Sequence, residues 1–157
     1  MSKTKPWEIS KLSIKQNLTP SAKIILRQRL ENFLSSINLY LSEINPENLH
    51  QVRISLRRLR YLMEVFLKYF DRKKYLSFYK IVSSLQDLSG EVRDLDILKQ
   101  NLNIYCNKDK SKTEEINFSK IDIKKEQFQS NLKLELMKFI HGKELKEIGR
   151  ASCRERV

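Results

Sequence analysis

An all-α fold, an antiparallel four-helix bundle, is predicted by three observations on the sequence. Only 3 Gly and 3 Pro occur among 157 residues, too few for the many turns of an all-β protein. Hydrophobic residues make up 40% of the chain and recur at spacings of three and four, the periodicity of amphipathic helices. Four such segments follow one another with short polar connections, and helices joined by short loops pack antiparallel.

The first two helices are predicted to begin where a capping residue precedes a proline. Thr19-Pro20 and Asn45-Pro46 each place a capping side chain before Pro at the first helical position, where the missing N–H costs nothing. They predict helices over about 20–43 and from 46 to about 69. The apolar side of the first consists of Ile24, Ile25, Leu26, Leu30, Phe33, Leu34, Ile37, Leu41 and Ile44.

The third helix, over about 72–104, is predicted to be capped by Asp71. The fourth, over about 116–140, is predicted to end at Gly142, and the charged segment 106–114 is predicted to be the loop between them. The apolar side of the third helix is Phe78, Ile81, Leu85, Leu88, Val92, Leu95, Leu98 and Leu102. That of the fourth is Ile121, Phe128, Leu132, Leu136, Phe139 and Ile140.

Both ends of the chain differ from the helical body. Residues 1–18 are a polar lead-in, and 147–157, EIGRASCRERV, show neither apolar periodicity nor capping residues. The latter segment resembles the translation of a sequencing adapter. We therefore expect the helical bundle to occupy 19–146 and the natural protein to continue past about Glu147.

The charge of the chain points to an anionic partner. Lys and Arg number 31 against 19 Asp and Glu, a net charge of +12. Two cysteines, Cys106 and Cys153, are too few for a disulfide framework or a zinc site. No apolar run approaches the ~18–20 residues of a membrane span, and the polar start lacks the apolar region of a signal peptide. We expect a cytoplasmic protein without a membrane partner.

The segment 49–66 combines an apolar arc with a row of cations. At 100° per residue, Val52, Leu56 and Leu59 lie on one arc that faces the core. Four cations fall within roughly 80° on one flank of that arc, about 4.5–6 Å apart along the axis, and are predicted to lie at the edge of the core and not at the solvent pole. This basic row consists of His50, Arg53, Arg57 and Arg60, whereas Arg58 lies on the other flank.

A row of like charges weakens a helix by about 0.2–0.5 kcal/mol per pair, so this arrangement suits a polyanion. Arginine is the appropriate residue, because its planar guanidinium binds phosphate oxygens bidentately and stays charged. The alternative is that these arginines pair with acids of the third helix. The acids available there are Asp87, Glu91, Asp94 and Asp96.

Catalytic and metal-binding patterns are not found in the sequence. It has no P-loop, H-E-x-x-H or G-x-S-x-G motif, so we expect no enzymatic activity and no cofactor, and His50 is interpreted as a phosphate contact. Asp94 and Asp96 point to different helical faces, which favours supporting or capping roles over a metal site. A nucleic-acid-binding protein is the rival interpretation, but base stacking needs aromatics interleaved with cations, and only Tyr61 lies near the basic row.

Two motifs resemble those of the CHAD family, the conserved histidine α-helical domain. The segment PENLHQVRISLRRLRYLMEVF is similar to the signature H-x-x-R-V-x-x-R-R-L-R, with Ile54 in place of Val. Its basic positions are matched by His50, Arg53, Arg57, Arg58 and Arg60. The segment LQDLSGEVRDLDILKQNL is similar to a second block, L-x-x-L-G-x-x-R-D-x-D-V-L. The matches there are Gly90, Arg93, Asp94, Asp96 and Leu98, and Ser89 replaces an apolar residue.

The resemblance implies an all-helical domain of two similar bundles that binds inorganic polyphosphate along a basic groove. This chain resembles the N-terminal half, so 19–146 is expected to be a partial domain. The implied polyphosphate-binding residues are His50, Arg53, Arg57, Arg58, Arg60 and Arg93, with Arg27, Lys80 and Lys124 as further candidates. Association with polyphosphate granules and only non-specific contact with nucleic acid are expected, and the oligomeric state is left open.

Overall fold

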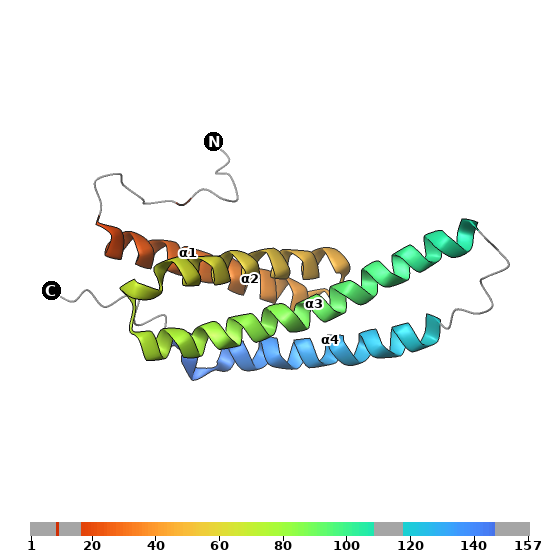
Figure 1. The fold of residues 1–157 in the computed structure, drawn as a ribbon. Coiled ribbons are helices and arrows are strands. Elements are labelled where there is room, and N and C mark those ends of the chain that lie inside the picture. The colour runs from red at the N-terminus through yellow and green to blue at the C-terminus, as the bar shows by residue number, and fades with distance from the viewer. Residues whose placement is uncertain (1–8, 10–16, 109–117, 147–157) are drawn as a thin grey trace, which may run out of the picture.

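Four long α-helices make up the computed structural model, which describes residues 9, 17–108 and 118–146 (Figure 1). They are α1 (Leu18–Ser42), α2 (Pro46–Phe66), α3 (Arg72–Lys108) and α4 (Phe118–His141), and the short 3-10 helix η1 (Leu67–Tyr69) connects α2 to α3. Within these described ranges there is no strand. The predicted all-α class and the helical bundle are confirmed.

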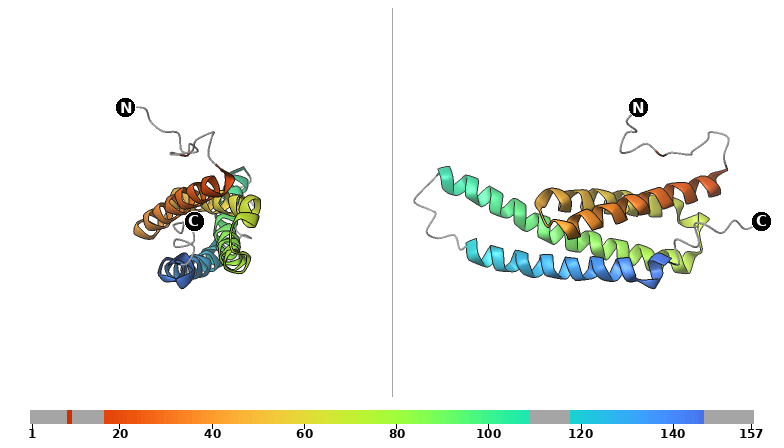
Figure 2. Two further views of the ribbon diagram at one scale, coloured as in Figure 1. Left: turned by 90° about the vertical axis from the view of Figure 1, so that its left-hand side faces the viewer. Right: turned by 180° about the vertical axis from the view of Figure 1, so that it is seen from behind.

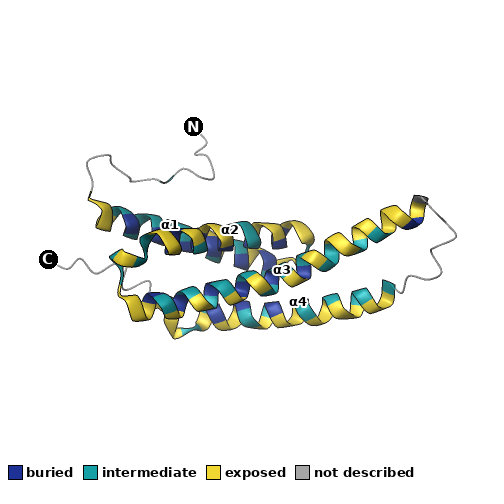
Figure 3. Cartoon of the chain, viewed as in Figure 1, coloured by how far each residue is buried: buried dark blue, intermediate teal, exposed yellow. Residues whose placement is uncertain are grey.

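Helices that are consecutive in the chain pack against each other along the bundle. α1 packs on α2, α2 on α3 and α3 on α4, whereas α1 and α4 meet over a short stretch. α3 and α4 continue together past the connection between α1 and α2 (Figures 1 and 2). Among the described residues α1 and α2 do not reach this extension, and mostly exposed residues occupy the far part of α3 (Figure 3). Leu98, predicted to be a core residue, is 44% exposed there.

Three predicted helix ends are confirmed by hydrogen bonds. The Asn45 side chain accepts from the backbone N–H of Asn48 at 2.7 Å, with Pro46 in the first turn of α2. Oδ1 of Asp71 accepts from the backbone N–H of Lys74 at 3.0 Å. The backbone N–H of Gly142 donates to the carbonyl of Phe139 at 3.2 Å, just after α4 ends.

Two predicted boundaries are wrong. α1 begins at Leu18 with Asn17 as its N-cap residue, so Pro20 lies third in the helix and not first. The proline is still tolerated, because the first N–H groups of a helix have no partner within it. α3 continues to Lys108, so the first residues of the predicted loop 106–114 are helical, and Cys106 is buried. The predicted tail 147–157 and most of the lead-in 1–18 lie outside the described residues.

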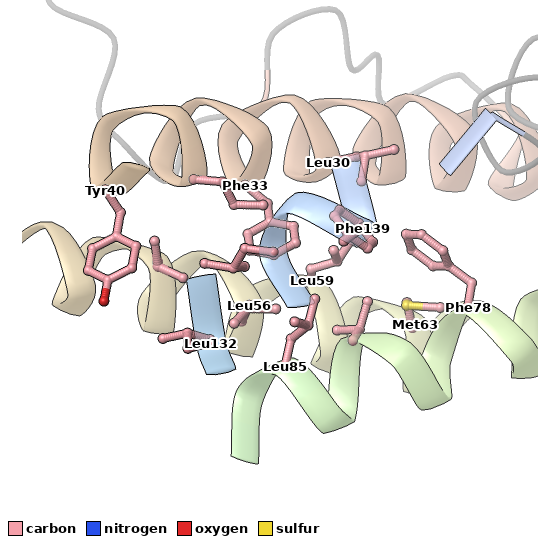
Figure 4. Packing of buried hydrophobic residues seen from close by; sticks show 14 of the residues in the cluster. Leu30, Phe33, Tyr40, Leu56, Leu59, Met63, Phe78, Leu85, Leu132 and Phe139 are labelled. Atoms are coloured by element: carbon pink, nitrogen blue, oxygen red, sulfur yellow. The ribbon is translucent and has the colours of Figure 1, made fainter. Parts of the chain in front are cut away.

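The core draws side chains from all four helices (Figure 4). Phe139 of α4 packs on Phe33 of α1 with 5.3 Å between ring centroids, and on Phe78 of α3 at 5.7 Å. Tyr40 and Tyr75 are also buried, although the apolar periodicity did not single them out. Burial, and then the charge of Asp96, raises the pKa of Tyr40 to about 12.

A serine pair sets the register of α1 against α2. The hydroxyls of Ser36 and Ser55 are 2.7 Å apart, and Ser55 also donates to the carbonyl of Val52 at 2.9 Å. The two helices run antiparallel. Counting the same number of residues back from Ser36 on α1 and forward from Ser55 on α2 therefore gives positions at the same level along the bundle. None of the helices in the described ranges is long and apolar enough to span a membrane.

Candidate functional site: a basic surface between α2 and α3

The apolar arc of α2 faces the core, as predicted, and this orients the basic row. Val52, Leu56 and Leu59 are buried. Arg53 and Arg60 are half-buried, whereas His50 and Arg57 are exposed. The expectation that the whole row lies at the edge of the core is therefore wrong for His50 and Arg57. The cause is geometric, since a row about 80° wide reaches from the flank of the helix towards its solvent side.

Arg53 packs against the only glycine of α3. A Cβ built on Gly90 would lie 3.3 Å from Nη1 of Arg53, so the guanidinium fills the space that a side chain at this position would take. Glycine within a helix costs about 1 kcal/mol relative to alanine. Here it lets a cation from α2 approach the backbone of α3. The preceding residue, Ser89, is fully buried, and its hydroxyl donates to the Gln86 carbonyl at 2.8 Å.

The guanidinium of Arg53 lies in an unfavourable environment. Burial lowers its pKa, the carboxylate of Asp94 partly offsets this, and the cations Arg93 and Arg57 lower the pKa further. Nη1 of Arg53 is buried and has no hydrogen-bond partner among the described residues. An unsatisfied buried donor costs about 1–3 kcal/mol. Arg53, Arg57 and Arg93 thus form a cluster of cations that an anion would stabilise.

The register of α2 against α3 places the remaining cation of the cluster. Arg53 lies beside Gly90, and, eleven positions further along α2, Glu64 accepts from the Tyr79 hydroxyl at 2.7 Å. Tyr79 is likewise eleven positions before Gly90, so both contacts have one antiparallel register. In that register Arg93 is level with His50. We call His50, Arg53, Arg57 and Arg93 the α2–α3 basic surface.

Arg60, although it belongs to the basic row, pairs with an acid. Its Nε lies 3.0 Å from Oε1 of Glu64. The hydrogen bond to Glu64 raises the pKa of Arg60, and the hydrogen bonds from Tyr79 and from Arg60 lower the pKa of Glu64. The i,i+4 spacing of Arg60 and Glu64 is a signal for such a pair, but Tyr79 becomes its partner only through the packing of α3. Glu64 therefore partly offsets the charge of Arg60.

The alternative interpretation was that the arginines of the basic row pair with acids of α3, and the structure does not show such pairs for Arg53 and Arg57 within the described ranges. Asp96 pairs with Lys125 of α4. Within the described ranges no ion pair joins Arg53, Arg57 or Arg58 to an acid. Asp94 is near enough to Arg53 to affect its pKa but forms no such pair. Asp94 and Asp96 have different neighbours, and the part of the chain that the structure describes has no group of three His, Cys, Asp or Glu that could hold a metal ion.

The three further candidate cations lie elsewhere in the bundle. Nε of Arg27 pairs with Glu31 at 2.9 Å on α1. Lys80 lines a groove between α3 and α4 that Glu135 also lines. Nζ of Lys124 lies 5.6 Å from the ring centroid of Phe128 on α4. None of the three joins the α2–α3 basic surface.

The fold and the site together define a class of protein, an all-helical bundle with arginines clustered between two of its helices. Comparison with protein families identifies the class further, because the model of the CHAD domain matches residues 7–149. This chain belongs to the CHAD family. The family is associated with polyphosphate binding and is not known as a family of enzymes. Neither the comparison with curated proteins nor that with solved structures finds a match to this chain.

Proposed function

We propose that this protein binds inorganic polyphosphate on the α2–α3 basic surface, without a chemical step. The observation that supports this most strongly is the position of Arg53, half-buried beside Gly90 with Arg57 and Arg93 as neighbouring cations. A phosphate oxygen would remove the repulsion among these charges. Charge-assisted hydrogen bonds to guanidinium groups contribute about 1.5–3 kcal/mol each. The family membership supports the same ligand.

The proposed binding residues are not equivalent. His50, Arg53, Arg57 and Arg93 provide the principal contacts, and Arg60 contributes less because Glu64 already pairs with it. Arg58 is exposed on the other flank of α2. The proposed location is the cytoplasm, at polyphosphate granules, with only non-specific contact to nucleic acid.

A nucleic-acid-binding function is the second candidate, and one residue favours it. Tyr61 is 55% exposed and lies one turn after Arg57, where its ring is accessible to a base. Stacking contributes about 1–3 kcal/mol per base. A single aromatic gives one stacking position, whereas the cations of the basic surface need only phosphates. The polyphosphate proposal therefore accounts for more of the surface.

Competition between the two polymers tests the proposal. Labelled medium-chain polyphosphate bound to the protein at physiological salt is challenged with duplex DNA at equal phosphate concentration. We expect polyphosphate to remain bound, because a flexible chain can enter the border between two helices and a duplex cannot. Displacement by DNA would support the nucleic-acid function instead. Physiological salt is essential, since any polymer of phosphates binds a basic protein at low salt.

Substitution of Gly90 tests the role of the arginine beside it. Gly90→Ala is expected to raise the free energy of unfolding by up to about 1 kcal/mol and to change the affinity for polyphosphate little, since Arg53 yields by a few tenths of an ångström. Gly90→Val is expected to displace the guanidinium and weaken binding about tenfold, or ~1.4 kcal/mol. Chemical unfolding and calorimetric titration measure the two effects. A folded Gly90→Val protein with unchanged affinity would exclude a binding role for Arg53 in its observed position.

A further inference from the structure

Two arginines, Arg29 and Arg58, lie at the border between α1 and α2. Arg29 lies seven residues before Ser36, which brings it back to the same face of α1 after two turns. Arg58 lies three residues after Ser55 on α2. Because Ser36 and Ser55 are hydrogen-bonded across the antiparallel pair, both arginines lie on the same side of that contact. Their levels along the bundle differ by only about 6 Å, or four residues.

The two side chains are close enough to affect each other. Burial lowers the pKa of Arg29, and the cation of Arg58 lowers it further. Arg29 is half-buried and Arg58 is exposed. The sequence does not single out Arg29, which is one of three cations of α1 with Lys23 and Arg27. Only the register of α1 on α2 brings it beside an arginine of the family signature.

Adjacent residues of α2 connect this pair to the α2–α3 basic surface. Arg57 and Arg58 are neighbours in the chain and differ by 100° around the helix. They therefore lie on either side of the solvent-facing side of α2. The two registers described above put Arg93 level with His50 and Arg29 level with Leu62. A line of cations therefore crosses α2 from α3 to α1. It consists, in this order, of Arg93, Arg53, Arg57, Arg58 and Arg29, and we call these five residues the diagonal track. It advances about 18 Å along the axis of α2 while crossing from one border to the other.

We propose that Arg29 is a further phosphate-binding residue and that the phosphate chain lies along the diagonal track, across α2. This inference rests on the proposed function and specifies its ligand further. A triphosphate is too short to reach both borders and binds at the α2–α3 basic surface alone. A longer polymer engages the α2–α3 basic surface and also Arg29 and Arg58, so the protein selects phosphate chains by length.

Binding of two probes by three variants tests this. The wild-type protein, Arg29→Gln, Arg58→Gln and the control Arg72→Gln are titrated with medium-chain polyphosphate and with tripolyphosphate at the same salt concentration. Arg72 is exposed at the start of α3, outside the track, and its substitution removes the same charge. With the polymer we expect Arg29→Gln and Arg58→Gln to bind about tenfold more weakly than Arg72→Gln. With tripolyphosphate we expect the three variants to agree within about twofold.

Three other results of this experiment would contradict the proposal in different ways. If Arg29→Gln and Arg58→Gln bind the polymer as well as Arg72→Gln does, the diagonal track is wrong while the proposed function stands. If both lose affinity equally for polymer and tripolyphosphate, selection by chain length is wrong. If the wild-type protein does not bind the polymer at all, the proposed function and this inference fail together. Should Arg29→Gln unfold, as thermal unfolding would reveal, the exposed Arg58 still gives the decisive comparison.

Discussion

Phe139→Ala is expected to lower the free energy of unfolding by about 3–5 kcal/mol, the usual cost of truncating a buried phenylalanine. The ring of Phe139 on α4 packs on both Phe33 of α1 and Phe78 of α3. Since α1 and α4 meet over only a short stretch, few other contacts compensate for its loss. Such a change is a large part of the ~5–15 kcal/mol that stabilises a typical domain.

Urea unfolding followed by circular dichroism measures this effect, and Met137→Ala is the matched control on the same helix. Met137 is 41% exposed, so its truncation should cost well under about 1 kcal/mol beyond any change in helix propensity. Equal destabilisation by the two substitutions would mean that α4 does not close the bundle through Phe139.

Arg57→Ala is expected to weaken the binding of medium-chain polyphosphate at least about tenfold, or ~1.4 kcal/mol. Arg57 lies in the middle of the proposed binding surface, is exposed, and has no ion pair within the described ranges. Its removal also relieves the repulsion that lowers the pKa of Arg53. We therefore expect the free energy of unfolding to stay unchanged or to rise slightly.

Arg72→Ala controls for net charge in this experiment. The register of α2 on α3 puts Arg72 about 20 Å from the level of Arg57 along the bundle. Calorimetric titration of both variants at fixed salt gives the comparison. A delocalised attraction between a basic protein and a polyanion predicts equal losses, and that outcome would argue against a binding surface centred on Arg57.

The helices could be predicted from the sequence because their signals are local. Asn45-Pro46 and Asp71 cap the helices that follow them, and apolar spacing located most of the core. Tyr40 and Tyr75 could not be recognised as core residues, since tyrosine is common at surfaces and its burial depends on packing between helices. The prediction that Leu98 is a core residue was wrong, because an apolar stripe on one helix does not reveal where the neighbouring helix ends.

The candidate site was predictable only within one helix. The basic row followed from the 100° step of α2. The motif identified Gly90 but did not explain why glycine is needed there. That reason, the approach of Arg53 to the backbone of α3, depends on the register between two helices. The pairing of Arg60 with Glu64 was within reach of an i,i+4 argument, whereas Arg29 is brought to Arg58 by tertiary packing alone.

The central claim is that polyphosphate binds where α2 meets α3, and arginine side-chain NMR tests it most directly. The Nε–Hε resonances of the protein are followed while medium-chain polyphosphate is added at physiological salt. The resonances of Arg53, Arg57 and Arg93 are predicted to shift together and to saturate, while that of Arg72 stays in place. A uniform small shift of all arginines, or a saturating shift of Arg72 with Arg53 unchanged, would contradict the account.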